Sequence, residues 1–207
     1  MSGFKIPWLE IDLPKESIDF LWDTISDTDS HTDARKGLAG NISKSNFMPD
    51  KDDWFFKNSL EGWSNTMFFK DWSNYYPVHV SKITPAPKFK LNGFWVNYQK
   101  QYEFNPPHTH SSEYSFVVFM KIPTHWKEQH ELPMCVNSRT PCAGDFSFFF
   151  SDTMHHGVVK SHTIKLSPEY EGKMLFFPSD LTHQVYPFYG TEEERITISG
   201  NIEKISG

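Results

Sequence analysis

The alternation of apolar and polar residues divides the chain near residue 88. Before that point, apolar residues recur at helical spacing within residues 13–26 and 49–76, which predicts two amphipathic helices. Pro14 is a favourable start for the first helix, and Asp50 is a candidate cap for the second. We interpret residues 1–88 as a helical elaboration whose helices pack on one sheet of the region that follows.

From about Phe89 the pattern changes to the period of two that is typical of β-strands. Turns rich in Pro, Gly and Asp separate the apolar segments. The predicted strands are residues 89–100, 114–122, 144–152, 157–166, 172–178, 183–188 and 195–205. This order predicts a mainly β fold, an antiparallel sandwich or barrel of the jelly-roll type, over residues 89–207. The 207 residues suit one domain with an N-terminal elaboration.

Composition excludes several classes of protein. The net charge of −6 argues against a broad basic surface for nucleic acid. No segment approaches the roughly 20 apolar residues of a membrane span, and the N-terminus lacks the pattern of a signal peptide. Cys135 and Cys142 fit neither a disulfide framework nor a zinc motif, so two reduced thiols are the simpler interpretation. We therefore expect a cytoplasmic protein.

Three potential metal ligands, His108, His110 and Glu113, lie within six residues just before the apolar segment 114–122. If "HTH" opens a strand, the two imidazoles point to the same side, because side chains two apart share a face. Glu113 joins them only if the backbone bulges or turns between Ser111 and Ser112. An isolated pair of this kind also occurs on protein surfaces, so the motif needs support from elsewhere in the chain.

A second segment supplies that support. His183 follows an apolar strand and a Pro-Ser-Asp turn, and Arg195 begins the next apolar strand. Thr197 and Ser199 are in phase with Arg195 and should share its face. Burying a guanidinium is costly unless an anion meets it, and a carboxylate is its natural partner. The segment therefore predicts an anion site inside the sheet structure.

The spaced set "HTH…E", "FPSDLTH" and "ERITISGNI" resembles the iron(II)/2-oxoglutarate-dependent dioxygenases over about residues 90–202, in particular small members from bacterial viruses and marine bacteria. The resemblance implies a double-stranded β-helix, another name for this jelly roll, that binds Fe(II) and 2-oxoglutarate. It implies two groups of site residues: metal ligands His108, His183 and one of His110 and Glu113, and cosubstrate contacts Arg195, Thr197, Ser199 and Tyr98.

The chain departs from the family pattern at one position. Where the family usually has Asp or Glu, two residues after the first histidine, this sequence has His110. Either the site uses three histidines, or Glu113 supplies the carboxylate while His110 lies behind the ligands. The sequence leaves this choice open.

The activity implied by the resemblance is that of an oxidoreductase. It would use dioxygen to hydroxylate an amino-acid side chain or a small metabolite and would release succinate and CO2. A cupin-type metalloenzyme without 2-oxoglutarate and a non-catalytic jelly-roll binding module are the alternatives. His155 and His156, in a predicted loop, are candidates to line the substrate entrance. The oligomeric state stays open, with a dimer through the N-terminal helices as one option.

Overall fold

The computed structural model describes residues 7–75, 87–152 and 157–205. The strands of this part are β1 (Leu9–Asp12), β2 (Thr32–Asp33), β3 (Ser45–Phe47), β4 (Lys88–Gln99), β5 (Asn105–His108), β6 (Tyr114–Lys121), β7 (Phe146–Asp152), β8 (Val158–Ile164), β9 (Lys173–Pro178), β10 (Thr182–Val185) and β11 (Arg195–Ile205). The helices are α1 (Lys15–Ser26), α2 (Glu61–Tyr75) and α3 (Trp126–His130), with a π-helical turn (Phe56–Leu60) before α2 and 3-10 turns at Thr28–Ser30, Arg35–Gly37, Lys51–Asp53 and Pro168–Tyr170. Among these residues, no helix is both long and apolar enough to cross a membrane.

The strands form two antiparallel sheets. The larger sheet has the order β1-β9-β6-β11-β4-β3-β2, and the smaller has the order β5-β10-β7-β8. All seven segments predicted as strands coincide with strands of these sheets. The jelly-roll fold expected from the period-two pattern is therefore confirmed.

The position of strand β6 between two hydrophobic cores explains why its sequence is a nearly continuous apolar run rather than an alternating one. Phe116 and Val118 belong to a core on the helix side of the larger sheet, whereas Val117 and Phe119 belong to a second core between the two sheets. Because both faces of β6 are covered, its central positions are apolar on both sides.

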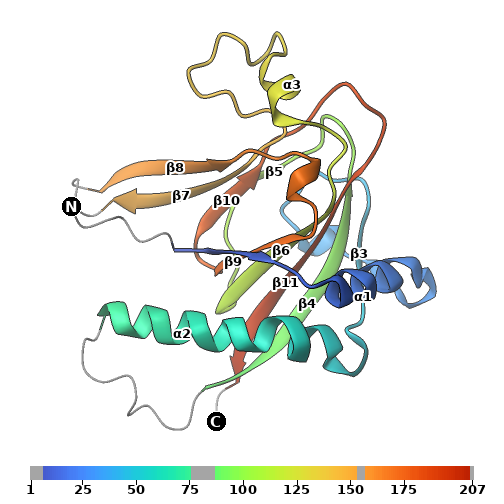
Figure 1. Ribbon diagram of the computed structural model, residues 1–207, viewed down its shortest axis with the longest axis vertical. Helices are drawn as coiled ribbons and strands as arrows, with labels where there is room; N and C mark the ends of the chain where they lie inside the picture. Colours follow the sequence, from blue (N-terminus) through green and yellow to red (C-terminus); the bar gives the residue numbers. More distant parts are fainter. Residues whose placement is uncertain (1–6, 76–86, 153–156, 206–207) are drawn as a thin grey trace.

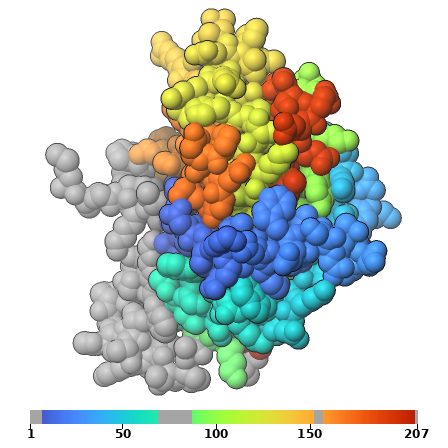
Figure 2. All heavy atoms as spheres, turned by 45° about the vertical axis from the view of Figure 1, so that its right-hand side comes forward, coloured from blue at the N-terminus to red at the C-terminus, as the bar shows by residue number. Residues whose placement is uncertain are grey.

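The helices α1 and α2 lie on the outer face of the larger sheet, and the smaller sheet lies on its other side (Figure 1). Leu21 of α1 and Met67 of α2 are fully buried there with Phe94 of β4 and Phe176 of β9. In Figure 2 the N-terminal residues form a band across the face, below residues 124–145. The prediction that N-terminal helices pack on one sheet is confirmed. The sequence pattern did not predict that the same region also supplies β1, β2 and β3 to the edges of that sheet.

Gly200 on β11 lies where this strand approaches its neighbours most closely. A methyl group there would lie 2.7 Å from the Phe116 ring and 2.8 Å from the backbone oxygen of Gly93. Because both belong to central strands that have little room to move, we expect Gly200→Ala to lower the free energy of unfolding by about 1–3 kcal/mol, measured by urea denaturation.

Gly62 on α2 provides the matched control, because no atom lies within 4 Å of the position that an added methyl group would occupy. Gly62→Ala should raise the free energy of unfolding by about 0.5–1 kcal/mol, the usual gain for a helix interior. A Gly200→Ala variant as stable as the wild type would contradict the close approach of the three strands.

Candidate active site

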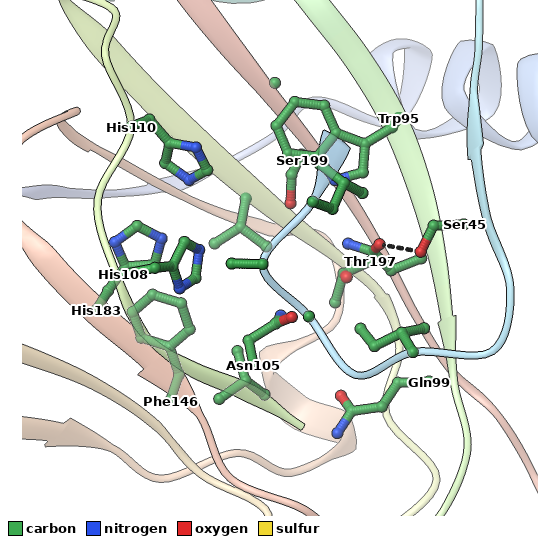
Figure 3. A pocket seen from close by; sticks show the side chains of 18 of the residues that line it. Ser45, Trp95, Gln99, Asn105, His108, His110, Phe146, His183, Thr197 and Ser199 are labelled. Atoms are coloured by element: carbon green, nitrogen blue, oxygen red, sulfur yellow. Dashed lines mark hydrogen bonds between the residues drawn. The ribbon is translucent and has the colours of Figure 1, made fainter. Parts of the chain in front are cut away.

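Three imidazole rings meet on one wall of a cavity between the two sheets (Figure 3). His108 is the last residue of β5, and His183 lies directly opposite it in the antiparallel pairing of β5 with β10. The centroids of these two rings are 4.2 Å apart. The ring centroid of His110 lies 5.0 Å from that of His108 and 5.2 Å from that of His183. The strand pairing thus joins histidines that are far apart in the sequence.

A tight turn after β9 fixes the position of His110. The backbone N–H of His110 donates a hydrogen bond to the backbone oxygen of Ser179 at 2.8 Å. The Ser179 side chain is buried and lies 2.7 Å, hydroxyl to hydroxyl, from Ser115. The turn recognised in the sequence before His183 therefore also holds the second histidine, which the sequence did not indicate.

Backbone carbonyl groups set the tautomers of two of the rings. The Nδ1 atom of His183 lies 2.9 Å from the oxygen of Leu181, and that of His108 lies 2.7 Å from the oxygen of Pro106. Because a carbonyl oxygen only accepts hydrogen bonds, both Nδ1 atoms carry the proton. The Nε2 lone pairs of His108 and His183 are then free to bind a metal ion.

Burial keeps His110 and His183 neutral. His183 is 5% exposed and packs against the rings of Phe146 and Phe177, with centroids at 5.7 and 4.8 Å. Burial, assisted by the charge of a protonated His108, lowers the pKa of His183 to about 3 and that of His110 to about 4. Both rings are therefore uncharged at neutral pH, which is the form that binds metals.

His108, His110 and His183 each offer a ligand atom, and these atoms lie within 4.8 Å of one another. Within the described ranges they are the one group of His, Cys, Asp or Glu that could hold a metal ion. Glu113 is exposed and lies outside this group. The segment "HTH" also does not open a strand as expected: β5 ends at His108, and the contact with Ser179 turns His110 inward.

Arg195, the first residue of β11, carries a guanidinium that is buried and partly unpaired. Its side chain is 1% exposed, and its Nη2 donates to the backbone oxygen of Gly144 at 2.6 Å. Nη1 lies 3.5 Å from Oε1 of Gln99, and Nε has no hydrogen-bond partner. Burial lowers the pKa of Arg195 to about 10, against the opposing charge of Asp145, so the group stays cationic at neutral pH. A buried cation with an unmet donor is suited to bind an anion.

Thr197 and Ser199 line the same cavity as Arg195, as their phase along β11 predicted. Each of the three lies opposite a cavity residue of β4 in the antiparallel register: Gln99, Asn97 and Trp95. The side chains of Gln99, Thr197 and Ser199 thus lie on the wall of the cavity that faces the histidines (Figure 3).

Tyr98, expected near the cosubstrate, lies on the other face of β4. It is buried in the helix-side core with Val96 and Ile198, and the Lys44 ammonium group lies 3.8 Å from its ring centroid. Because neighbouring residues of a strand point to opposite faces, a strand that presents Asn97 and Gln99 to the cavity turns Tyr98 away from it. The structure therefore does not bring Tyr98 to the site.

The cavity contains about 790 Å³ of empty space, part of it open to solvent. Residues 35–45, which we term the cover segment, form one of its walls and cross in front of it in Figure 3. The backbone N–H of Asn41 donates to the oxygen of Phe104 at 2.8 Å, which ties the cover segment to the residue before β5. A methyl group on Gly40 would overlap the amide oxygen of Asn105, so a larger residue there would require the Asn105 side chain to move.

The polar residues of the wall opposite the histidines were not predicted. Ser45 donates a hydrogen bond to Oδ1 of Asn97 at 2.7 Å, and Gln99 follows Asn97 on the same face of β4. A signal was present, because amide side chains at alternate positions of a buried strand indicate a polar cavity. His155 and His156, expected near the entrance, lie outside the described residues.

In this protein a jelly-roll fold brings a histidine cluster and a buried arginine to one cavity. This combination is typical of the non-haem metal enzymes with this fold. Residues 93–201, more than half of the chain, match the family described as "Putative 2OG-Fe(II) oxygenase". The chain belongs to this family. It is an oxygenase whose metal is Fe(II) and whose cosubstrate is 2-oxoglutarate. This membership decides against the cupin-type and non-catalytic alternatives. No curated protein matches the sequence.

Solved structures share the fold at low sequence identity. An oxidoreductase of the 2OG-Fe(II) oxygenase family from Burkholderia pseudomallei is 9% identical with a TM-score of 0.57, and the match covers 97% of this chain and 86% of that one. A prolyl-4-hydroxylase from Pseudomonas putida is 14% identical with a TM-score of 0.49, covering 97% and 94%. The likeness to the Burkholderia protein shows the fold and not the substrate.

Proposed function

We propose that this oxygenase binds Fe(II) through His108, His110 and His183 and binds the distal carboxylate of 2-oxoglutarate through Arg195. The reaction proposed is hydroxylation of an amino-acid side chain or small metabolite, with release of succinate and CO2. One observation carries the proposal: three imidazoles and a buried guanidinium with an unpaired donor converge on the same cavity.

The donor set supports Fe(II). Imidazole is a good ligand for this ion, and three ligands on one side leave positions open for the cosubstrate and dioxygen. The bound iron and 2-oxoglutarate supply the oxidising chemistry, and the chain binds, orients and keeps water out. With His110 in place of a carboxylate, the ligand set brings one negative charge less to the metal.

The other end of the cavity supports 2-oxoglutarate. The Nε–H of Arg195 is the donor that lacks a partner, and the hydroxyl groups of Thr197 and Ser199 follow it on the same face of β11. The ring of Phe188 lies 4.9 Å from the guanidinium and shields one of its sides. An arginine fork in such a dry site is well suited to a carboxylate.

The charges around the cavity favour a substrate whose reacting part is neutral or anionic. Among the described residues, its charged lining is Arg35 and Arg195, and no carboxylate lines it. Arg35 is itself paired with Asp33, Nη2 to Oδ2 at 2.7 Å. An ammonium group near the metal would find no carboxylate on the cavity wall to pair with, which disfavours amines as substrates. Uncharged hydrogen-bonding groups on Ser45, Asn97 and Asn105 suit polar neutral substrates.

The test is the fate of 2-oxoglutarate. Protein loaded with Fe(II) should convert 2-oxoglutarate and labelled dioxygen into succinate that carries one labelled oxygen, whereas metal-free protein should not. A product one oxygen atom heavier, found by mass spectrometry after incubation with pooled peptides and metabolites, would identify the substrate. Iron-loaded protein that consumes no 2-oxoglutarate, with or without such a pool, would contradict the proposal.

A further inference from the structure

We propose that Asp145 is the counterion of Arg195 and that His130 holds it away from the guanidinium, which keeps the donors of Arg195 free for 2-oxoglutarate. This inference rests on the proposed role of Arg195 in binding the distal carboxylate. Asp145 acts through Arg195, so it is a positioning residue and not a catalytic one.

The carboxylate of Asp145 is completely buried, and both its oxygens are engaged away from Arg195. Oδ2 accepts a hydrogen bond from Nε2 of His130 at 2.6 Å, and Oδ1 accepts one from the backbone N–H of Leu166 at 3.2 Å. The exposed fractions of the His130 and Asp145 side chains are 9% and 0%. Within the described chain, no hydrogen bond joins Asp145 to Arg195.

The two charges nevertheless act on each other. Burial lowers the pKa of Arg195 and the charge of Asp145 raises it. Burial raises the pKa of Asp145, and the hydrogen bond from His130 and the charges of His130 and Arg195 lower it. Each group therefore offsets part of the cost of burying the other without forming a direct ion pair.

This separation matters for ligand binding. A direct ion pair would occupy the guanidinium donors, and an incoming carboxylate would have to displace the aspartate first. A counterion held by His130 offsets the buried charge in the ligand-free protein and leaves Nε–H of Arg195 available. The backbone oxygen of Gly144, next to Asp145, accepts the hydrogen bond from Nη2 of Arg195. Its φ of +77° suits glycine, and an added Cβ would lie 3.5 Å from that nitrogen.

The test is Asp145→Asn, which removes the charge and keeps the shape. Without the negative charge behind it, Arg195 should bind 2-oxoglutarate more tightly, by about threefold or more. The melting temperature without 2-oxoglutarate should fall, and the rise on adding 2-oxoglutarate should be larger than in the wild type. Calorimetric titration of Mn(II)-loaded full-length protein measures the affinity. Asp29→Asn, on the exposed surface, is the matched control and should change neither quantity.

The expected increase in affinity distinguishes the proposal from a purely structural role of Asp145, because a disturbed pocket would bind 2-oxoglutarate more weakly. Weaker or unchanged binding in Asp145→Asn, with binding lost in Arg195→Gln, would overturn this inference alone. Unchanged binding in Arg195→Gln would instead overturn the proposed cosubstrate site.

A second variant keeps the test decisive if Asp145→Asn does not fold. Asp145→Asn combined with Arg195→Gln removes both charges, and a neutral pair is tolerated better than one buried charge alone. Recovery of folding in the double variant would support the pairing of the two charges. If neither variant folds, the role of Asp145 is limited to its hydrogen bonds with His130 and Leu166. That result would overturn the proposal.

Discussion

Replacing His183 with alanine is expected to lower the affinity for Fe(II) by more than about 100-fold, because even residues that only orient a metal ligand typically contribute about 10- to 100-fold. His183 is the most buried of the three histidines, and its Nε2 atom is free. Turnover of 2-oxoglutarate should be lost with the metal. Iron retained after anaerobic dialysis, and succinate formed with excess Fe(II), measure the two effects.

Variants at His110 and Glu113 separate the two candidates for the third ligand. His110→Ala should lose iron, whereas His110→Asp should bind it at least about tenfold more tightly than His110→Ala, because a carboxylate is also a good ligand for Fe(II). Glu113→Gln should bind iron like the wild type, since Glu113 is exposed and outside the cluster. His162→Ala, at an exposed imidazole of β8, is the control. Iron lost from Glu113→Gln and kept by His110→Ala would reverse the assignment.

The fold followed from the sequence because its period-two pattern is a direct consequence of burial. Strand β11 is an example. Its alternating pattern predicted that Thr197 and Ser199 share a face with Arg195, and in the structure all three line the same cavity. The same rule, applied to β4, excludes Tyr98 from the cavity, because the residues that face it are Asn97 and Gln99. Tyr98 was named from resemblance and not from phase, which is why its position was missed.

The remaining features depend on contacts between segments distant in the sequence. His110 turns inward because a backbone oxygen 69 positions further along, that of Ser179, accepts its N–H, and no local pattern encodes such a contact. The cover segment is largely irregular, and the hydrogen bond from Asn41 to the distant Phe104 holds it beside the cavity. Asp145 lay within the predicted strand 144–152 without being singled out, and only its buried contacts set it apart.

Replacing Arg195 with glutamine is expected to weaken 2-oxoglutarate binding by about 30-fold or more, since truncating one partner of a buried charge pair costs about 2–5 kcal/mol. The affinity of Arg195→Lys for 2-oxoglutarate should lie between those of the wild type and Arg195→Gln, because lysine keeps the charge and loses the planar fork. The titration used for Asp145→Asn measures both affinities. Arg139→Gln, at an exposed arginine, is the matched control.

Iron binding provides the internal check on this prediction. The three histidines take their orientation from Pro106, Leu181 and Ser179, and among the described residues Arg195 forms its hydrogen bonds with other groups. The iron content of Arg195→Gln should therefore match that of the wild type. Loss of iron together with 2-oxoglutarate would indicate a collapsed cavity. A variant that keeps its iron and binds 2-oxoglutarate like the wild type would mean that another cation holds the distal carboxylate. Arg35 is the remaining arginine on the cavity wall, and releasing it would require breaking its pairing with Asp33.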